Sequence, residues 1–177
     1  MNDYAPTELE HCVLAVIWRI QPCTAYQVRT AFQSSLTASW RASTGSIYPI
    51  LRKLNAHHLV TETAVSGDRR GTRKLNIASA GVRSLESWLC DRAAWIAEPV
   101  ADPIRTRSYT LPMLPTGEAK LLIAHWKAET ERALSEIKQR LAQYKKANDV
   151  MEQIAHRGTE VQIAARLAWL NELETSL

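Results

Sequence analysis

Three side chains able to bind a polyanion recur at helical spacing near residue 50. Tyr48, Arg52 and Asn55 stand at i, i+4 and i+7, so one helix would present them on a single face, with Lys53 on its flank. The apolar residues of the same stretch also recur with helical period and are Ile47, Ile50, Leu51 and Leu54. They predict an adjacent, buried face. Such a helix fits the major groove of DNA, whereas the alternative is an ordinary solvated helix.

Pro49 indicates where this helix begins. A proline has no N–H to donate and is tolerated only in the first turn, where backbone donors lack intrahelical acceptors. Ser46 is therefore a better N-cap candidate than Thr44, and residues 44–46 would lie at the helix N-terminus. Free N–H groups and the positive end of the helix dipole favour a phosphate at such a place. We therefore expect Thr44 and Ser46 to contact a phosphate.

A predicted β-hairpin with a cationic tip follows the helix. Residues 59–65 and 75–77 have strand-like composition, and Gly67 and Gly71 allow a tight turn between them. The charged residues between positions 41 and 74 are Arg41, Arg52, Lys53, Arg69, Arg70, Arg73 and Lys74 against Glu62 and Asp68. This segment has a net charge of 7 − 2 = +5, whereas the whole chain has +4. A basic helix followed by a basic hairpin is typical of nucleic-acid binding.

Two further helices are predicted before this stretch. Residues 7–10 have the sequence of a capping box, and the helix that follows should end before Pro22. Residues 24–27 form a second capping box, which predicts a helix to about Leu36. Two helices, a turn, a basic helix and a basic hairpin are the elements of a winged helix-turn-helix.

This N-terminal part resembles the PadR family of winged helix-turn-helix transcriptional regulators. The resemblance rests on Ala25 and Tyr26, Trp40, the string GSIYPILRKL at residues 45–54, Leu59 and Val60, Arg70 and Arg73. The chain departs from the family where Ala25 and His58 replace usual glycines, and where Leu75 and Ala78 replace a usual aromatic residue and a threonine. His58 would then end the basic helix in a left-handed conformation.

The resemblance implies a sequence-specific DNA-binding regulator that acts as a homodimer on double-stranded DNA, and we expect a repressor. Its recognition helix would lie in the major groove and its basic wing on the backbone or in the minor groove. The candidate DNA contacts are Thr44, Ser46, Tyr48, Arg52, Lys53, Arg69, Arg70 and Arg73. A winged helix can instead bind another protein without DNA, but the local charge of +5 favours DNA.

The chain after the hairpin is predicted to be helical on both sides of a proline-rich connector. Ser79 can cap a helix whose apolar stripe reaches Trp95, and residues 98–115 contain four prolines. We expect a DNA-binding domain with a trailing helix at residues 1–97, a connector with extended pieces at 98–115 and a helical dimerisation domain at 116–177.

Residues 116–177 have the pattern of two long helices. Thr116 is a good N-cap for the first, and a second apolar pattern begins at Val150 and passes through Gly158. The first helix carries a coiled-coil-like seam of Leu134, Ile137, Leu141 and Tyr144. A small monomer cannot bury both seams, so we expect a second copy to cover them. Residues 91–177 carry 12 basic and 12 acidic side chains, a balance that suits protein contacts better than DNA.

Four tryptophans have two interpretations. Trp88, Trp95, Trp126 and Trp169 either line a pocket for a small aromatic effector or fill helix and dimer interfaces, and we favour packing for most of them. Residues 102–103, the long charged helix and residues 168–170 also resemble the C-terminal helical domain of the longer PadR-type proteins. In that family the domain holds the dimer together and, in some members, helps to form an effector pocket.

Composition favours a globular protein without catalytic chemistry. The 177 residues are 46% hydrophobic and 23% charged. No apolar run has a membrane helix's length of about twenty residues, and the start lacks a signal sequence, so we expect a cytoplasmic protein without a membrane partner. Three widely spaced cysteines and the absence of catalytic motifs predict reduced thiols, no metal, no cofactor and no enzyme. The predicted fold class is mainly α with one small β-hairpin.

Overall fold

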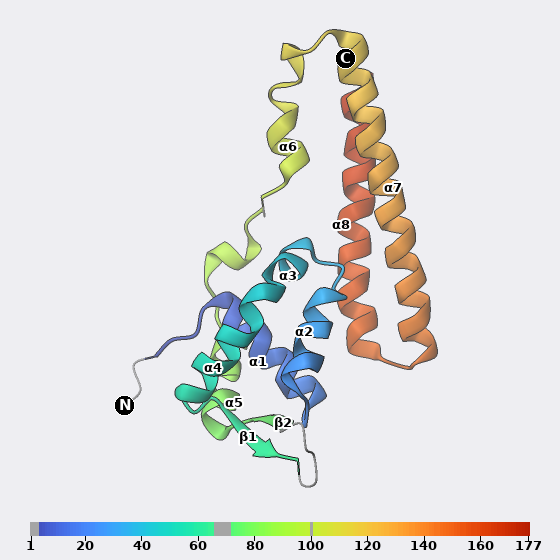
Figure 1. The fold of residues 1–177 in the computed structure, drawn as a ribbon. Helices are drawn as coiled ribbons and strands as arrows, with labels where there is room; N and C mark the ends of the chain where they lie inside the picture. Colours follow the sequence, from blue (N-terminus) through green and yellow to red (C-terminus); the bar gives the residue numbers. More distant parts are fainter. Residues whose placement is uncertain (1–3, 66–71, 100) are drawn as a thin grey trace. The chain divides into compact units, whose positions relative to one another are not determined.

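The structure, a computed structural model, describes residues 4–65, 72–99 and 101–177, except for the side chains of Ala94 and Trp95. It divides into two compact units, an N-terminal unit of Met1–Ala97 and a C-terminal unit of Glu98–Leu177. The described residues form helices and one two-stranded sheet, which confirms the mainly α fold with a β-hairpin (Figure 1). None of the helices is long and apolar enough to cross a membrane, as judged over the described residues.

The first two helices begin at the capping boxes predicted from the sequence. Helix α1 (Glu8–Ile20) follows Thr7, whose N–H donates to the Glu10 carboxylate over 2.7 Å. Helix α2 (Ala25–Gln33) follows Thr24, whose N–H donates to the Gln27 side chain over 2.8 Å. Each box satisfies backbone donors that the first helical turn leaves without partners.

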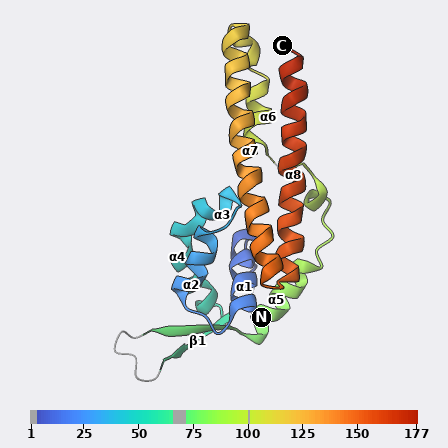
Figure 2. The same cartoon turned by 90° about the vertical axis from the view of Figure 1, so that its right-hand side faces the viewer.

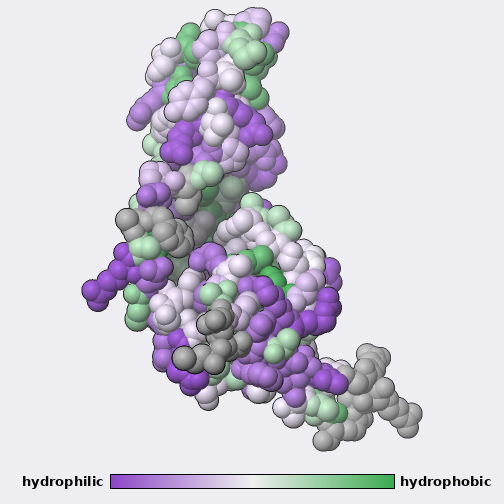
Figure 3. All heavy atoms as spheres, turned by 90° about the vertical axis from the view of Figure 1, so that its left-hand side faces the viewer, coloured by the Kyte–Doolittle hydropathy of each residue, from purple (hydrophilic) through white to green (hydrophobic). Residues whose placement is uncertain are grey.

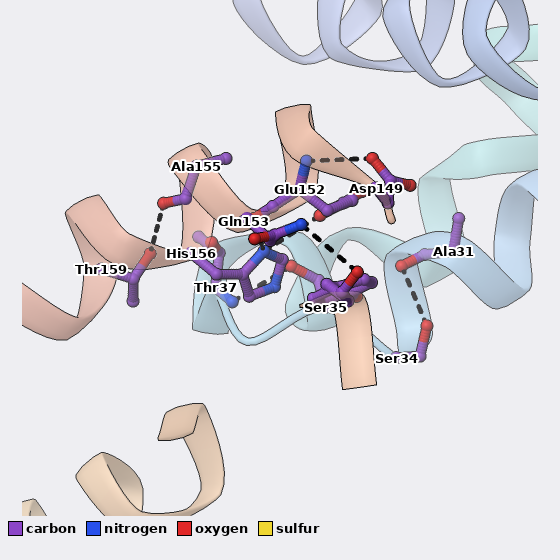
Figure 4. Close-up of polar contacts among 11 residues, drawn as sticks. Ala31, Ser34, Ser35, Thr37, Asp149, Glu152, Gln153, Ala155, His156 and Thr159 are labelled. Atoms are coloured by element: carbon purple, nitrogen blue, oxygen red, sulfur yellow. Dashed lines mark hydrogen bonds and ion pairs between the residues drawn. The ribbon is translucent and has the colours of Figure 1, made fainter. Parts of the chain in front are cut away.

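Helix α2 is shorter than predicted, and a helix that the sequence did not indicate follows it. It ends at Gln33, because the next residues form a turn in which the Ser34 hydroxyl donates to the Ala31 carbonyl (Figure 4). Helix α3 (Ala38–Ala42) continues directly into the 3-10 helix η1 (Ser43–Ser46). The prediction of one helix to Leu36 followed by a simple turn is therefore wrong.

An aromatic stack and the hydrogen bonds of one arginine side chain hold α3 in place. The ring of Trp40 stacks on Phe32 of α2 with 4.5 Å between centroids. The Arg41 guanidinium donates to the carbonyls of Ser35 and Leu36 over 2.8 and 2.9 Å. These contacts close the α2–α3 turn. Arg41, which the sequence places among the cations of residues 41–74, therefore stabilises the fold.

Helix α4 (Ile47–Ala56) is the predicted recognition helix, and its apolar face is buried. The buried residues are Ile47, Ile50, Leu51 and Leu54. The helix ends as predicted, with His58 in the left-handed region at φ 58°. The Leu59 N–H then donates to the Leu54 carbonyl over 2.9 Å, which satisfies a group at the helix C-terminus.

A two-stranded antiparallel sheet follows α4. Strand β1 (Val60–Ala64) pairs with β2 (Arg73–Ile77), with Val60 opposite Ile77 and Ala64 opposite Arg73. The predicted tip, residues 66–71, lies outside the described residues. Leu75 also exchanges two backbone hydrogen bonds with Cys23, just before α2. The hairpin is therefore fixed to the helix-turn-helix on one edge.

Helix α5 (Ser79–Leu89) packs against the junction between α4 and β1. Ser79 is its first residue and Ala78 occupies the N-cap position without a side-chain bond, so the predicted Ser79 cap is wrong. The reason is that the Ala78 N–H is held by the Leu59 carbonyl over 3.0 Å, which sets where α5 begins. A Cβ on Gly81 would lie 2.1 Å from the same carbonyl oxygen, so only glycine allows this close packing.

The C-terminal unit replaces the predicted extended connector with short helices. Helix α6 (Pro103–Ser108) is capped by the Asp102 carboxylate, which accepts from the Ile104 and Arg105 N–H groups. A 3-10 helix, η3 (Leu111–Met113), follows. Aspartate before proline is a strong helix start, because it supplies a cap and a first residue that needs no acceptor. That local signal outweighs the general helix-breaking effect of prolines.

Helices α7 (Thr116–Lys146) and α8 (Val150–Thr175) form an antiparallel hairpin, side by side in both views (Figures 1 and 2). Thr116 is the first residue of α7 and makes no capping bond, since Pro115 occupies the cap position, so the predicted Thr116 cap is wrong. The Asp149 carboxylate caps α8 by accepting from the Glu152 N–H (Figure 4). Helix α8 continues through Gly158, as predicted.

Candidate nucleic-acid interface

The exposed side of α4 presents two polar groups that have no partner among the described residues. Tyr48 is 42% exposed and Arg52 is also exposed. Within residues 4–65, 72–99 and 101–177, neither side chain makes a hydrogen bond or an ion pair. The side of the N-terminal unit that carries α4 is mostly hydrophilic (Figure 3). A phenol hydroxyl and a guanidinium on a rigid helix can therefore bind an external acceptor.

Lys53, the neighbour of Arg52, is engaged inside the unit. Its ammonium lies 2.9 Å from the Glu10 carboxylate and 4.8 Å from the centre of the Tyr4 ring. Arg73 on β2 likewise lies 3.0 Å from the Glu62 carboxylate on β1. Both were predicted to contact DNA, but their charges are balanced by an acid of the same protein.

Glu10 is the buried centre of a cluster that the sequence did not indicate. Its side chain is 6% exposed and burial alone would raise its pKa, yet the bonds from the Thr7 backbone and Lys53 outweigh burial and lower the pKa to about 2. Burial and the Glu10 charge raise the pKa of Tyr4, whose ring stacks on His57 with 3.8 Å between centroids. This cluster fixes the N-terminal segment to α1 and to the end of α4.

Residues 44–46 do not form the predicted free helix N-terminus. Ser46 occupies the N-cap position of α4, but its side chain makes no capping bond because the backbone enters α4 from η1, already right-handed. The Ser43 N–H bonds to carbonyls of α3, and the Thr44 hydroxyl donates to the Arg41 carbonyl over 3.1 Å. Because α3, η1 and α4 follow one another directly, residues 44–46 lie within a continuous helical path instead of at a separate helix N-terminus, and Ser46 is exposed.

Two arginines of the predicted interface, Arg69 and Arg70, lie outside the described residues. Tyr26, at the second position of α2, is a further candidate that our prediction did not include. It is 66% exposed and, among the described residues, its hydroxyl has no hydrogen-bond partner. The signal was available, because Val28 and Phe32 define the buried face of α2 and Tyr26 lies away from it.

Residues 13–87 match the family described as the Transcriptional regulator PadR-like family. The matched segment spans α1 to α5, and therefore includes α4 and both strands. Residues 13–87 of this chain are therefore PadR-like. Because PadR-like proteins are transcriptional regulators, the expectation that the chain is not an enzyme is confirmed.

This PadR-like chain is similar to proteins of known function over most of its length. It is 25% identical over 130 residues to the negative transcriptional regulator PadR of Bacillus subtilis (strain 168), which covers 73% of this chain and 70% of that protein. The structure of Bacillus subtilis PadR in complex with operator DNA has a TM-score of 0.83 at 19% identity and covers 96% of this chain and 99% of that one. The complex of the same regulator with p-coumaric acid has a TM-score of 0.74 at 20% identity, with 95% and 94% covered. These likenesses confirm the fold of both units.

The four tryptophans singled out from the sequence belong to different units of this PadR-like chain. Trp88 of α5 donates its indole N–H to the Glu8 carboxylate over 2.7 Å, and its ring stacks on His11. Trp126 packs on the core of the C-terminal unit, and Trp169 is half-buried in α8. The side chain of Trp95 lies outside the described residues. Trp88 thus joins α5 to α1 within the N-terminal unit.

An open groove of ≈ 810 Å³ lies beside Trp88 in the N-terminal unit. Its lining includes Pro6, Glu8, His11, Ser87, Trp88 and Arg92. The lining thus contains an indole ring and an arginine, together with the carboxylates of Glu8 and Asp91.

The described part of the chain contains no group of three or more His, Cys, Asp and Glu side chains arranged to hold a metal ion. All three cysteines are free, and burial raises the pKa of Cys12 to about 11, which keeps that thiol protonated.

Proposed function

We propose that this PadR-like chain is a homodimeric repressor that reads specific double-stranded DNA with α4 in the major groove. The observation that carries the proposal is the pair Tyr48 and Arg52, which are exposed and have no partner in the part of the chain that the structure describes, on a helix whose other face is buried. The relative from Bacillus subtilis is a negative regulator, and its structure was determined with operator DNA. Such a protein acts where the chromosome is, so the proposed location is the cytoplasm.

Each exposed group has a distinct role in this arrangement. Arg52 can donate two hydrogen bonds to the edge of a guanine, which identifies the base. The Tyr48, Tyr26 and Ser46 hydroxyls can donate to phosphates, which fixes the position of the protein on the duplex. The wing arginines, Arg69 and Arg70, supply cations for the backbone or the minor groove. Lys53 and Arg73 contribute less, because each already has an acidic partner.

The C-terminal unit supplies the dimer contact in this proposal. Packing of α7 on α8 buries Ile137 and Leu170, yet several apolar residues of α8 stay exposed. They are Val150, Met151, Ile154 and Val161. A groove of ≈ 620 Å³ lies beside Ile154 and is also lined by Leu141 of α7. A second copy that covers these residues would place two recognition helices on half-sites about 34 Å apart.

We also propose a small aromatic effector, and the observation that favours it is the groove beside Trp88. Bacillus subtilis PadR has been crystallised with p-coumaric acid, a flat aromatic acid. In this chain the indole of Trp88 would contact the ring and Arg92 the acid group. Fluorescence titration of Trp88→Phe with the parent as reference tests this: loss of quenching by p-coumaric acid supports the site, and unchanged quenching removes it.

The experiment for DNA binding uses the full chain. The purified protein is incubated with fragmented genomic DNA, the retained fragments are sequenced, and the enriched duplex is titrated by fluorescence anisotropy. A specific site should bind about 1,000-fold or more tightly than a scrambled duplex of equal length. Equal affinity for both duplexes would contradict the proposal and favour a winged helix that binds a protein partner.

A further inference from the structure

The glycines that the structure describes are of two kinds, and Gly45 is of the kind that packing within the described residues does not require. Gly81 is required, because a Cβ there would lie 2.1 Å from the Leu59 carbonyl oxygen. A Cβ on Gly45, in contrast, would have no other atom within 4 Å among the described residues. Gly45 also has no left-handed backbone that would demand glycine, since it lies within the regular 3-10 helix η1.

A glycine at such a position lowers stability. It lies where α3, η1 and α4 follow one another as continuous right-handed helix, and glycine in a helix costs about 1 kcal/mol relative to alanine. Neither packing nor backbone geometry within the described residues offsets this cost. The other physical use of glycine is to let the main chain approach a bound molecule closely.

The side chains around Gly45 leave its backbone accessible. The hydroxyls of Ser43 and Thr44 turn back to the carbonyls of Ser39 and Arg41, over 2.7 and 3.1 Å. Gly45 and Ser46 are both exposed, and Tyr48 with its free hydroxyl follows in the first turn of α4. No side chain therefore projects from the surface at Gly45, and hydrogen-bond donors lie beside it.

We propose that Gly45 is where the sugar-phosphate backbone of the DNA comes closest to the protein main chain, so that its missing side chain sets how deeply α4 enters the major groove. This inference rests on the proposed function. The molecule that approaches Gly45 is DNA, because Gly45 lies immediately before α4. The exposed Tyr48 hydroxyl and the Arg52 cation of α4 would bind the same duplex. A methyl group at Gly45 would displace the duplex and weaken the contacts that Tyr48 and Arg52 make.

The experiment compares Gly45→Ala and Gly45→Leu with the parent. Both variants should unfold at the same or a higher temperature than the parent, because alanine and leucine favour a helix. Affinity for the enriched duplex should fall about tenfold for alanine and further for leucine. The slope of log affinity against log salt should stay unchanged, because no charge is removed. A loss that grows with side-chain size at a constant salt slope is what a steric contact predicts.

Gly117 provides the matched control. It lies in the first turn of α7 and, like Gly45, would place a Cβ where no other described atom lies within 4 Å. Gly117→Leu should therefore bind DNA like the parent. If the parent binds the enriched duplex and Gly45→Leu binds it equally well, the inference about Gly45 is wrong while the proposed function stands. If the parent itself does not discriminate between duplexes, the proposed function fails first.

Discussion

Arg52 and Lys53 are neighbours in sequence, yet their charges have different uses. Arg52 projects into solvent without a partner among the described residues, whereas Lys53 completes a pair with the buried Glu10. A cation paired at 2.9 Å must give up part of that interaction before it can bind phosphate. Counting charges in the basic segment therefore overstates the number available to DNA.

Tyr48→Phe tests the contribution of one hydroxyl. If this hydroxyl donates to a phosphate, removing it should weaken operator binding several-fold, which corresponds to about 1 kcal/mol. The melting temperature should not change, because the hydroxyl has no partner among the described residues of the free protein. Tyr109→Phe, at an exposed position of the C-terminal unit, is the control and should bind like the parent. Equal operator affinity of Tyr48→Phe and the parent would leave Tyr48 without a role in DNA binding.

Glu10→Gln tests the buried pair through its pH dependence. The pKa of Glu10 falls from 4.5 to about 2 on folding, so its contribution is fully present above about pH 4.5 and is lost as the pH falls through about 2. This difference corresponds to about 3 kcal/mol. The variant should therefore be less stable than the parent near neutral pH, and the gap should narrow below pH 4.5. Urea unfolding across this range provides the measurement, with the exposed Glu131→Gln as control.

At the scale of elements, α4 is positioned from three directions. The Tyr4 and Glu10 cluster contacts its C-terminal half through Lys53 and His57. Just after its C-terminal end, the carbonyl group of Leu59 packs against Gly81 of α5. The hairpin that follows is joined to the start of α2 through Cys23 and Leu75. These contacts hold the recognition helix rigidly, which a precise fit to DNA requires.

The wing is expected to add affinity without sequence preference. Arg69→Ala combined with Arg70→Ala should weaken binding to all duplexes and lower the steepness of the salt dependence by about two, because two phosphate contacts are lost. Arg73→Ala is the matched comparison and should change the slope less, since Glu62 already balances that charge. Anisotropy titrations at several salt concentrations measure both. An unchanged slope in the double variant would mean that the wing does not touch DNA.

At the scale of the whole molecule, the two units differ in how much of their apolar surface they bury. The N-terminal unit contains its own core, formed largely by α1, α2, α4 and the sheet. The C-terminal unit is a two-helix hairpin with a smaller core around Leu111, Ala119 and Ile123. A hairpin of this kind buries one side of each helix and leaves the other side for a partner.

Ile154 and Val161 are seven residues apart and therefore lie on one side of α8. Lysine at both positions should convert a dimer into a monomer, because two charges would be buried in the apolar contact. Operator affinity should then fall steeply, since a monomer reads only one half-site. Sedimentation at micromolar concentration measures the state, and Gln139→Lys, at an exposed polar position of α7, is the control. A parent protein that sediments as a stable monomer would contradict the proposed dimer.

The amino-acid sequence by itself determined the features that depend on neighbouring residues. Both N-terminal capping boxes, the buried face of α4 and the continuation of α8 through Gly158 follow from it. Each of these is set within a few turns of one helix, where spacing and side-chain type fix the geometry. The family resemblance extended this interpretation to the fold and to the left-handed end of α4 at His58.

Only the tertiary structure decided which cations are available and where several helices begin. The pair between Lys53 and Glu10, the start of α5 against the Leu59 carbonyl and the stacking of Trp88 on His11 join residues that are far apart in the chain. The empty space at Gly45 and the absence of space at Gly81 are equally invisible in the sequence, where both are simply glycine. The physical reason is that a side chain's partner and the room around a Cβ are properties of packed segments, and local spacing carries no information about them.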